Sequence, residues 1–255
     1  MTNNLVAFQT IVNKEVSRFM RIWSQTLLPS AITQSLYFLI FGAFVGSQIP
    51  AVNGVTYMQF IVPGLVMMAV ITNSFANVVS SFFGAKFQRN LEELLVAPVS
   101  NWSIIGGFTI GGSLRGMIVG AIVWGVSFFF TQQSISHPLV MLGFAAMTSI
   151  VFSLLGLLNG IFAKKFDDVG LVTTFVLTPL TYLGGVFYEI NRLPAFWQTI
   201  SKFNPIVYMV DGFRFGFYGK SEFNLYLDFG ILFAFAAVLT WVNYYLIKKG
   251  VGLKS

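Results

Sequence analysis

The chain has 255 residues, of which 56% are hydrophobic, 17% are aromatic and only 9% are charged. An ordinary soluble domain carries about 25% charged residues, so this composition excludes a soluble globular enzyme. The mean hydropathy of +0.76 indicates a chain whose main solvent is lipid. The net charge of +6 reflects 9 Asp and Glu residues against 15 Lys and Arg residues. The Lys and Arg residues are scattered between apolar runs and form no basic patch of the kind that binds nucleic acid.

The residue types that carry chemistry are scarce. The absence of cysteine excludes disulfides, thiolate nucleophiles and Cys-bound metal. The single histidine, His137, leaves no histidine cluster or triad. We therefore expect no catalytic, cofactor-binding or metal site in this chain.

Long charge-free runs predict the membrane spans. Residues 22–85 and 116–163 contain no Asp, Glu, Lys or Arg, and each run exceeds twice the roughly 20 residues that cross a bilayer core. Turn-forming stretches divide them at 46–54, which ends in Asn53-Gly54, and at 132–138. Together with the remaining runs, the sequence predicts an all-α polytopic protein with six transmembrane helices, at about 24–46, 59–83, 102–130, 139–163, 169–188 and 225–247.

Basic residues in the short loops predict the orientation. With six spans, both ends of the chain lie on one side of the membrane. That side collects Lys14, Arg18, Arg21, Lys86, Arg89, Lys164, Lys165, Lys248, Lys249 and Lys254. The opposite side carries Arg192, Lys202, Arg214 and Lys220. The excess predicts cytoplasmic termini, and residues 1–255 are expected to form one transmembrane domain.

The N-terminal segment is amphipathic. Apolar residues recur every three or four positions over 4–23, at Leu5, Phe8, Val12, Val16, Phe19 and Trp23. The charged residues Lys14, Glu15, Arg18 and Arg21 fall mostly elsewhere on the helical wheel. The pattern predicts a helix over 1–23 that lies on the cytoplasmic interface, and a simple membrane anchor is an equally good interpretation.

A second amphipathic stretch covers residues 84–98. Its apolar positions are Phe87, Leu91, Leu94 and Leu95, and Pro98 is expected to end the helix. Lys86, Arg89, Glu92 and Glu93 are expected to project toward the cytoplasm. A loop that only reverses direction can be much shorter, so the stretch predicts a docking site for a cytoplasmic partner. The alternative is a set of charges that merely reach toward the interface.

Arg115 lies inside the third span. A charge at that depth is costly, so it should face a partner, a water-filled cavity or a subunit interface. Glycines at 112, 116 and 120 form a stripe that allows close helix approach, and this stripe is expected to leave room beside the arginine for an anionic headgroup. If the span begins later, Arg115 is an interfacial anchor instead.

Amide side chains also occur within the spans. Asn73, Asn77 and Asn159 must find partners away from lipid. They are expected either to join helices or to line a transport path, and they are available to compensate Arg115.

The segment 189–223 is long for a loop and rich in Phe, Trp and Tyr. Loops outside the membrane are normally polar. An apolar loop with prolines predicts short helices that dip back into the outer leaflet, which is tolerated where they pack against protein.

The motifs around this loop resemble those of a known family. They comprise the stretch from Pro179 to Tyr188, then Leu193-Pro194, Trp197-Gln198, Asn204-Pro205, Tyr208 and Asp211–Arg214. Upstream, the stretch from Phe87 to Ser100 is similar to the loop before that family's third helix. With the six-span layout, the whole chain resembles type-2 ABC exporter permeases, in the short bacterial form with a separate ATPase subunit.

The resemblance implies a homodimer in the bacterial inner membrane, with a cytoplasmic ATPase that binds ATP and Mg on each subunit. It implies export of an amphiphilic, lipid-like or drug-like substrate. Residues that would couple to the ATPase are Lys86, Phe87, Gln88, Arg89, Asn90, Glu92 and Glu93. Translocation-path candidates are Asn73, Asn77, Arg115, Asn159 and Tyr182. Candidates for an extracytoplasmic gate are Tyr188, Pro194, Trp197, Asn204, Pro205, Tyr208, Asp211 and Arg214.

The chain itself is expected to bind no nucleotide. It contains no P-loop sequence, and the nearest match, Gly219-Lys220-Ser221, has Arg214 where the first glycine is required. The alternatives are an ion-coupled secondary transporter and a membrane assembly subunit without transport. The first usually needs acidic groups near the membrane midplane, and none occurs at the centre of a predicted span.

Overall fold

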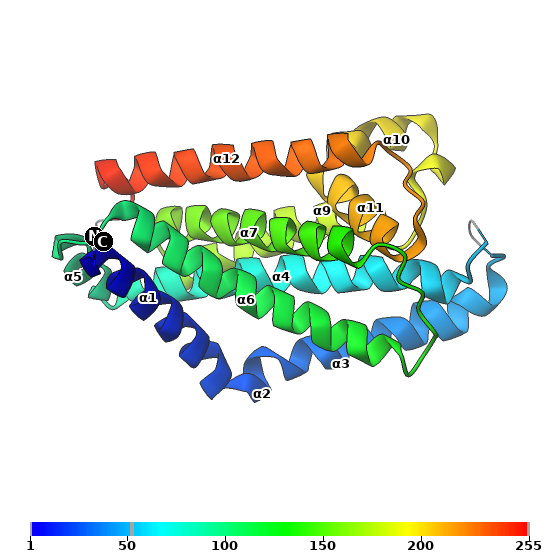
Figure 1. The fold of residues 1–255 in the computed structure, drawn as a ribbon, viewed down its shortest axis with the longest axis horizontal. Coiled ribbons are helices and arrows are strands. Elements are labelled where there is room, and N and C mark those ends of the chain that lie inside the picture. The colour runs from blue at the N-terminus through cyan, green and yellow to red at the C-terminus, as the bar shows by residue number, and fades with distance from the viewer. Residues whose placement is uncertain (1, 52–53, 254–255) are drawn as a thin grey trace.

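The computed structural model describes residues 2–51 and 54–253, with side chains from residue 4 onward. Asn53 of the predicted turn and Lys254, one of the basic residues used for orientation, lie outside the described residues. Helices make up the regular structure of the described chain, which contains no β-strand (Figure 1). The predicted all-α class is confirmed.

Within the described residues, five helical segments are long and apolar enough to cross a membrane. They are Trp23–Gln48, Tyr57–Phe87, Asn101–Ser127, Pro138–Phe162 and Leu225–Lys249. The first consists of α2 (Trp23–Thr26), α3 (Leu28–Tyr37), the π-helix η1 (Phe38–Val45) and the 3-10 helix η2 (Gly46–Gln48). The other four are α4 (Tyr57–Phe87), α6 (Asn101–Ser127), α7 (Pro138–Phe162) and α12 (Leu225–Lys249). They correspond to five of the six predicted spans.

The predicted span at 169–188 corresponds to a shorter helical segment. It joins α8 (Phe166–Val172), the π-helix η3 (Thr173–Leu177) and α9 (Thr178–Tyr182). The predicted end at 188 is wrong, because a turn follows Tyr182 in which Gly185 has φ +72. A positive φ is a conformation that glycine adopts readily and that a continuing helix excludes.

The centre of the bundle is α4, the most deeply buried of the five candidate spans. The glycines of α6 allow α6 to pack directly on it. A Cβ on Gly116 would lie 1.8 Å from Ser74 Oγ, and one on Gly112 would lie 2.3 Å from Val78 Cγ2. The predicted close approach of the two helices is confirmed. The expectation of free space beside the glycine stripe is wrong, because α4 side chains fill that space.

The helices run between two ends of the bundle (Figure 1). At one end α1 (Thr2–Arg21) begins, α12 ends, and α5 (Asn90–Val96) lies between α4 and α6. At the other end lie η4 (Ile190–Arg192), α10 (Ala195–Lys202) and α11 (Pro205–Tyr218). The segment 189–223 thus contains η4, α10 and α11, and α11 packs against α4, α7 and α12.

The N-terminal helix is more than a surface anchor. It packs along α6, where a Cβ on Gly107 would lie 2.6 Å from Ile11 Cγ2 and one on Gly111 would lie 2.4 Å from Glu15 Cβ. Glu15 is fully buried. The expectation that this charge lies away from the packed face is therefore wrong for Glu15.

Candidate functional site

The predicted coupling stretch 84–98 is two helices rather than one. The first is the end of α4, which runs to Phe87, and the second is α5, which begins at Asn90. Arg89 between them has φ 62, in the left-handed region. A helix cannot continue through that conformation, so the chain changes direction here.

The charged face of this stretch is exposed. Arg89, Glu92 and Glu93 face outward, while Leu91 is buried beneath them. Gln88 and Asn90 are also exposed, and Asn90 Nδ2 donates to Gln88 Oε1 at 3.2 Å. The site therefore offers both signs of charge at the end of the bundle where α1 begins.

One coupling candidate, Lys86, is placed differently from the prediction, and another, Phe87, lies on the surface. Lys86 is buried, and its ammonium donates to the backbone carbonyls of Ile161 and Ala163, both at 2.8 Å. Its expected projection toward the cytoplasm is wrong, because it caps the last turn of α7. Phe87, predicted as an apolar position of this stretch, is 61% exposed, and its ring centroid lies 4.9 Å from that of Phe166.

Asn73 and Arg115 meet between α4 and α6. Arg115 Nη2 donates to Asn73 Oδ1 at 3.3 Å and to the carbonyl of Thr26 at 3.0 Å. Asn73 Nδ2 donates to Ser30 Oγ at 3.0 Å. Of the compensators expected for Arg115, a backbone carbonyl and Asn73 are in contact with it.

Asn77, one turn further along α4, pairs with α1 instead. Arg18 Nη2 donates to Asn77 Oδ1 at 2.9 Å and to Glu15 Oε2 at 3.2 Å. Asn77 Nδ2 donates to Glu15 Oε2 at 3.3 Å, and Ser81 Oγ donates to the other carboxylate oxygen. A buried carboxylate thus holds α1 against α4.

The remaining path candidates lie apart from this network. Asn159 Nδ2 donates to the carbonyl of Val169 at 3.4 Å and joins α7 to α8. The hydroxyl of Tyr182 lies 2.9 Å from that of Tyr37, which joins α9 to α3. The structure therefore does not bring the five path candidates together in one site.

Several gate candidates organise the backbone around α11. Asn204 caps this helix by accepting from the Ile206 amide at 3.0 Å, and Pro205 occupies its first turn. Asn204 Nδ2 also donates to the carbonyl of Leu180 at 2.6 Å. Tyr208 donates from its hydroxyl to the carbonyl of Lys202 at 2.6 Å.

The other gate candidates occupy the start of this region. Pro194 precedes α10, on which Trp197 is 44% exposed. The Tyr188 hydroxyl is buried, and no hydrogen-bond partner for it occurs among the described residues.

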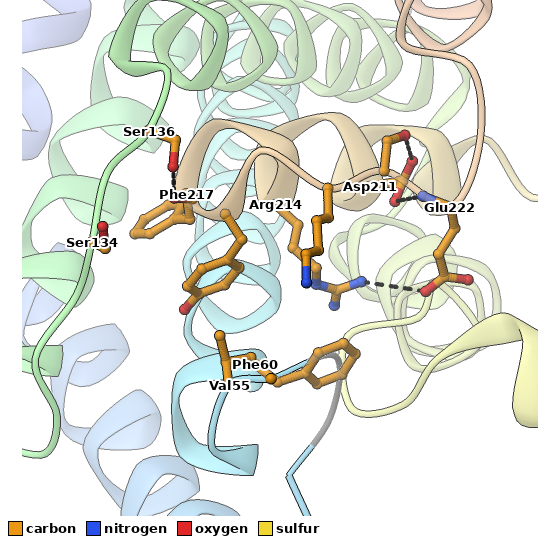
Figure 2. Close-up of a pocket in the computed structure, with 12 residues that line it drawn as sticks. Val55, Phe60, Ser134, Ser136, Asp211, Arg214, Phe217 and Glu222 are labelled. Carbon is orange, nitrogen blue, oxygen red and sulfur yellow. Dashed lines mark hydrogen bonds and ion pairs between the residues drawn. The ribbon is translucent and has the colours of Figure 1, made fainter.

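A cavity of about 290 Å³ opens beside α11 (Figure 2). Its charged lining includes Asp211, Arg214 and Glu222. The Arg214 guanidinium stacks over the Phe60 ring at 4.0 Å, donates to the carbonyl of Gly185 at 2.8 Å and lies 4.0 Å from Glu222. Burial raises the pKa of the Glu222 carboxyl, although Arg214 opposes this shift.

Asp211 supports the loop that closes this cavity. Its carboxylate accepts from the amides of Glu222 at 2.9 Å and Phe223 at 3.2 Å, and from the Ser221 hydroxyl. Gly219 precedes this loop with φ +65, as the C-cap of α11. The lookalike Gly219-Lys220-Ser221 therefore follows a helix end, whereas a P-loop leads into a helix N-terminus.

Sequence reasoning missed three contributors to these sites. The helical pattern predicts Glu15 and Arg18 on the polar face of the N-terminal helix, and it does not single out Glu222. Glu15 and Arg18 are separated by one helical turn, which is the spacing for an ion pair on one face. That spacing was the signal in the sequence that could have indicated this ion pair. No group of three His, Cys, Asp or Glu side chains within residues 2–51 and 54–253 is placed to hold a metal ion.

The apolar helices, their glycine contacts and the charged surface at α5 define a polytopic helical membrane protein. The family model described as ABC-2 type transporter matches residues 6–218. The chain therefore belongs to the ABC-2 type transporter family. It is a transmembrane transporter subunit rather than an enzyme, and the family in general implies an ATPase partner subunit.

Relatives extend over nearly the whole chain. It is 55% identical over 250 residues to the inner membrane transport permease YadH of Escherichia coli K12, which covers 98% of each protein. It is 24% identical over 218 residues to nodulation protein J of Rhizobium leguminosarum bv. viciae, covering 84% of this chain and 83% of that protein. The first similarity supports a multi-pass protein of an inner membrane.

Proposed function

We propose that this chain is the membrane subunit of an ATP-driven exporter and that it works as a homodimer with a separate cytoplasmic ATPase. Membership of the ABC-2 family and the exposed charged surface of α5 carry the proposal. The substrate class that we infer is an amphiphilic, lipid-like or drug-like molecule. It would leave from the cytoplasm or the inner leaflet.

We propose a six-span topology with cytoplasmic termini. The course of the chain supports it. In Figure 1, α7 ends near α5, whereas α12 begins at the opposite end. The chain must therefore return along the bundle between these helices, and α8, η3 and α9 are the segment available for that crossing. The basic residues near α5 support a cytoplasmic location for that end.

The length of α4 supports docking at the same end. Its 31 residues span about 46 Å at 1.5 Å per residue, whereas the hydrocarbon core is about 30 Å thick. The helix therefore extends beyond the core, and α5 follows directly from this extension. A partner that moves α5 would move the central helix of the bundle.

The opposite end supports a gate in the outer leaflet. There α11 is buried against three other helices, and the cavity lined by Arg214 and Glu222 lies beside it. Short packed helices at this position can separate a substrate path from the outer aqueous phase.

The decisive experiment is reconstitution with and without an ATPase. The full chain is purified alone and together with a candidate P-loop protein encoded by a neighbouring gene, and ATP hydrolysis and substrate release from vesicles are measured. We expect no hydrolysis by the chain alone, and ATP-dependent release only by the pair.

Two results would contradict the proposal. Release driven by an ion gradient without ATP would support a secondary transporter instead. In that class acidic groups near the midplane are usual, whereas Asp228 lies in the first turn of α12. A stable complex without any release would support an assembly subunit.

A further inference from the structure

Two arginines lie close together where α1, α4 and α6 meet. Arg18 donates to Asn77 and Arg115 donates to Asn73. These asparagines are one turn apart on α4, and four residues of helix rise about 6 Å. The two guanidiniums are therefore neighbours, held by adjacent turns of one helix.

The charges of this pair are only half compensated. Glu15 forms an ion pair with Arg18 at 3.2 Å, and no ion pair to Arg115 occurs in the described part of the chain. The site therefore keeps an excess of one positive charge. In a medium of low dielectric constant, such a charge strongly favours a nearby anion.

Both guanidiniums also have unused donors. The Nε atoms of Arg18 and Arg115 are buried, and neither has a hydrogen-bond partner among the described residues. A guanidinium carries five N–H donors, and within the described residues the hydrogen bonds of each arginine come from Nη2 alone. What the site lacks is an acceptor with several oxygens.

The site is accessible through Arg18, and exposed apolar residues lie near both arginines in the chain. The Arg18 side chain is 32% exposed. Ile22, one turn beyond Arg18, and Leu114, beside Arg115 in the chain, are about 40% exposed. Charged donors next to exposed apolar side chains suit a molecule that joins a phosphate to hydrocarbon.

We propose that Arg18 and Arg115 form a binding site for a phosphate group, supplied by an anionic phospholipid of the leaflet that α1 faces. A phosphate accepts bidentate hydrogen bonds from guanidinium groups, and its charge balances the excess at this site. Glu15 positions Arg18 from the buried side. The proposal goes beyond the exporter function and does not rest on it, because it concerns lipid binding without ATP or a partner.

The test is native mass spectrometry of the full chain in detergent. The chain is titrated with phosphatidylglycerol and with phosphatidylcholine of the same acyl chains. Wild-type protein should bind phosphatidylglycerol more tightly. Arg115→Gln, which removes the charge but keeps an amide donor, should weaken that binding about tenfold or more. Arg115→Lys should retain part of it.

Arg21→Gln is the matched control, because Arg21 is an exposed arginine of the same helix α1. It should leave the affinity for phosphatidylglycerol unchanged. Equal binding of the two lipids by wild type, or an unchanged preference in Arg115→Gln, would overturn the proposal. If Arg115→Gln does not remain monodisperse, Arg18→Lys and Arg115→Lys decide the question. A several-fold loss in either supports the site, and full affinity in both overturns it.

A competition arm identifies the source of the phosphate. Displacement of phosphatidylglycerol by millimolar inorganic phosphate would support a site that recognises the phosphate alone. Retention of the lipid under those conditions would support a phospholipid site to which Ile22 and Leu114 add apolar contact.

Discussion

The ammonium of Lys86, at the end of α4, donates a hydrogen bond of 2.8 Å to the backbone carbonyl of Ile161, at the end of α7. The last carbonyls of a helix have no partner within that helix, and a cation near them is favoured by the helix dipole. Lys86 meets both needs. The segment that leads into α5 is thereby joined to α7, so a force applied at α5 reaches two spans.

We expect Lys86→Met to destabilise the protein by about 1–3 kcal/mol, because buried carbonyls lose their donor. The measurement is thermal unfolding of the purified full chain in detergent. Lys249→Met, at an exposed position in the last turn of α12, is the control and should leave the melting temperature unchanged. An equal melting temperature for Lys86→Met and wild type would show that the contact contributes nothing.

Gly116→Ala should destabilise the packing of α6 on α4 by about 1–3 kcal/mol. The added methyl would overlap Ser74 Oγ and approach the carbonyl of Val70 to 2.9 Å, and backbone cannot easily yield. Gly125→Ala on the same helix meets nothing within 4 Å, and it should be neutral or stabilise by up to about 1 kcal/mol. Both variants are compared by thermal unfolding. Equal effects would contradict the role of the glycine stripe.

The exposed charges of α5 and the preceding turn should govern partner docking. We expect the double reversal Arg89→Glu with Glu92→Lys to weaken co-purification of the ATPase by several-fold, because charged pairs across an interface select the partner. Membrane insertion should be unchanged. Lys248→Glu, an exposed charge at the same end of the bundle, controls for a general charge effect. Partner retention at the wild-type level would show that these charges only reach toward the interface.

Asp211 should hold the loop that follows α11. In Asp211→Ala, the amides of Glu222 and Phe223 lose their acceptor, so we expect faster hydrogen exchange in residues 219–224. Ser134→Ala, at another position in the cavity lining, should leave that exchange unchanged. The measurement is hydrogen exchange followed by mass spectrometry. Unchanged protection in Asp211→Ala would contradict a supporting role for this carboxylate.

The location of five spans could be read from the sequence because lipid tolerates few charges, so charge-free runs mark the helices directly. The glycine stripe of α6 was also predictable, since close approach requires small residues at a spacing of four. The same reasoning extended the predicted span 169–188 beyond Tyr182, where α9 ends. The turn at Gly185 depends on a backbone conformation that hydropathy does not register.

By itself, the sequence determined that this protein lies in lipid, that it is helical and that the α5 segment carries charges of both signs. Only the tertiary structure decided where Glu15, Arg18 and Lys86 point. Their partners on other helices lie 59 to 77 residues away along the chain. A helical wheel separates polar from apolar faces, but it does not identify the helix that a face meets. A charged side chain in a membrane protein takes its role from that neighbour, because the neighbour supplies the hydrogen bonds that lipid cannot.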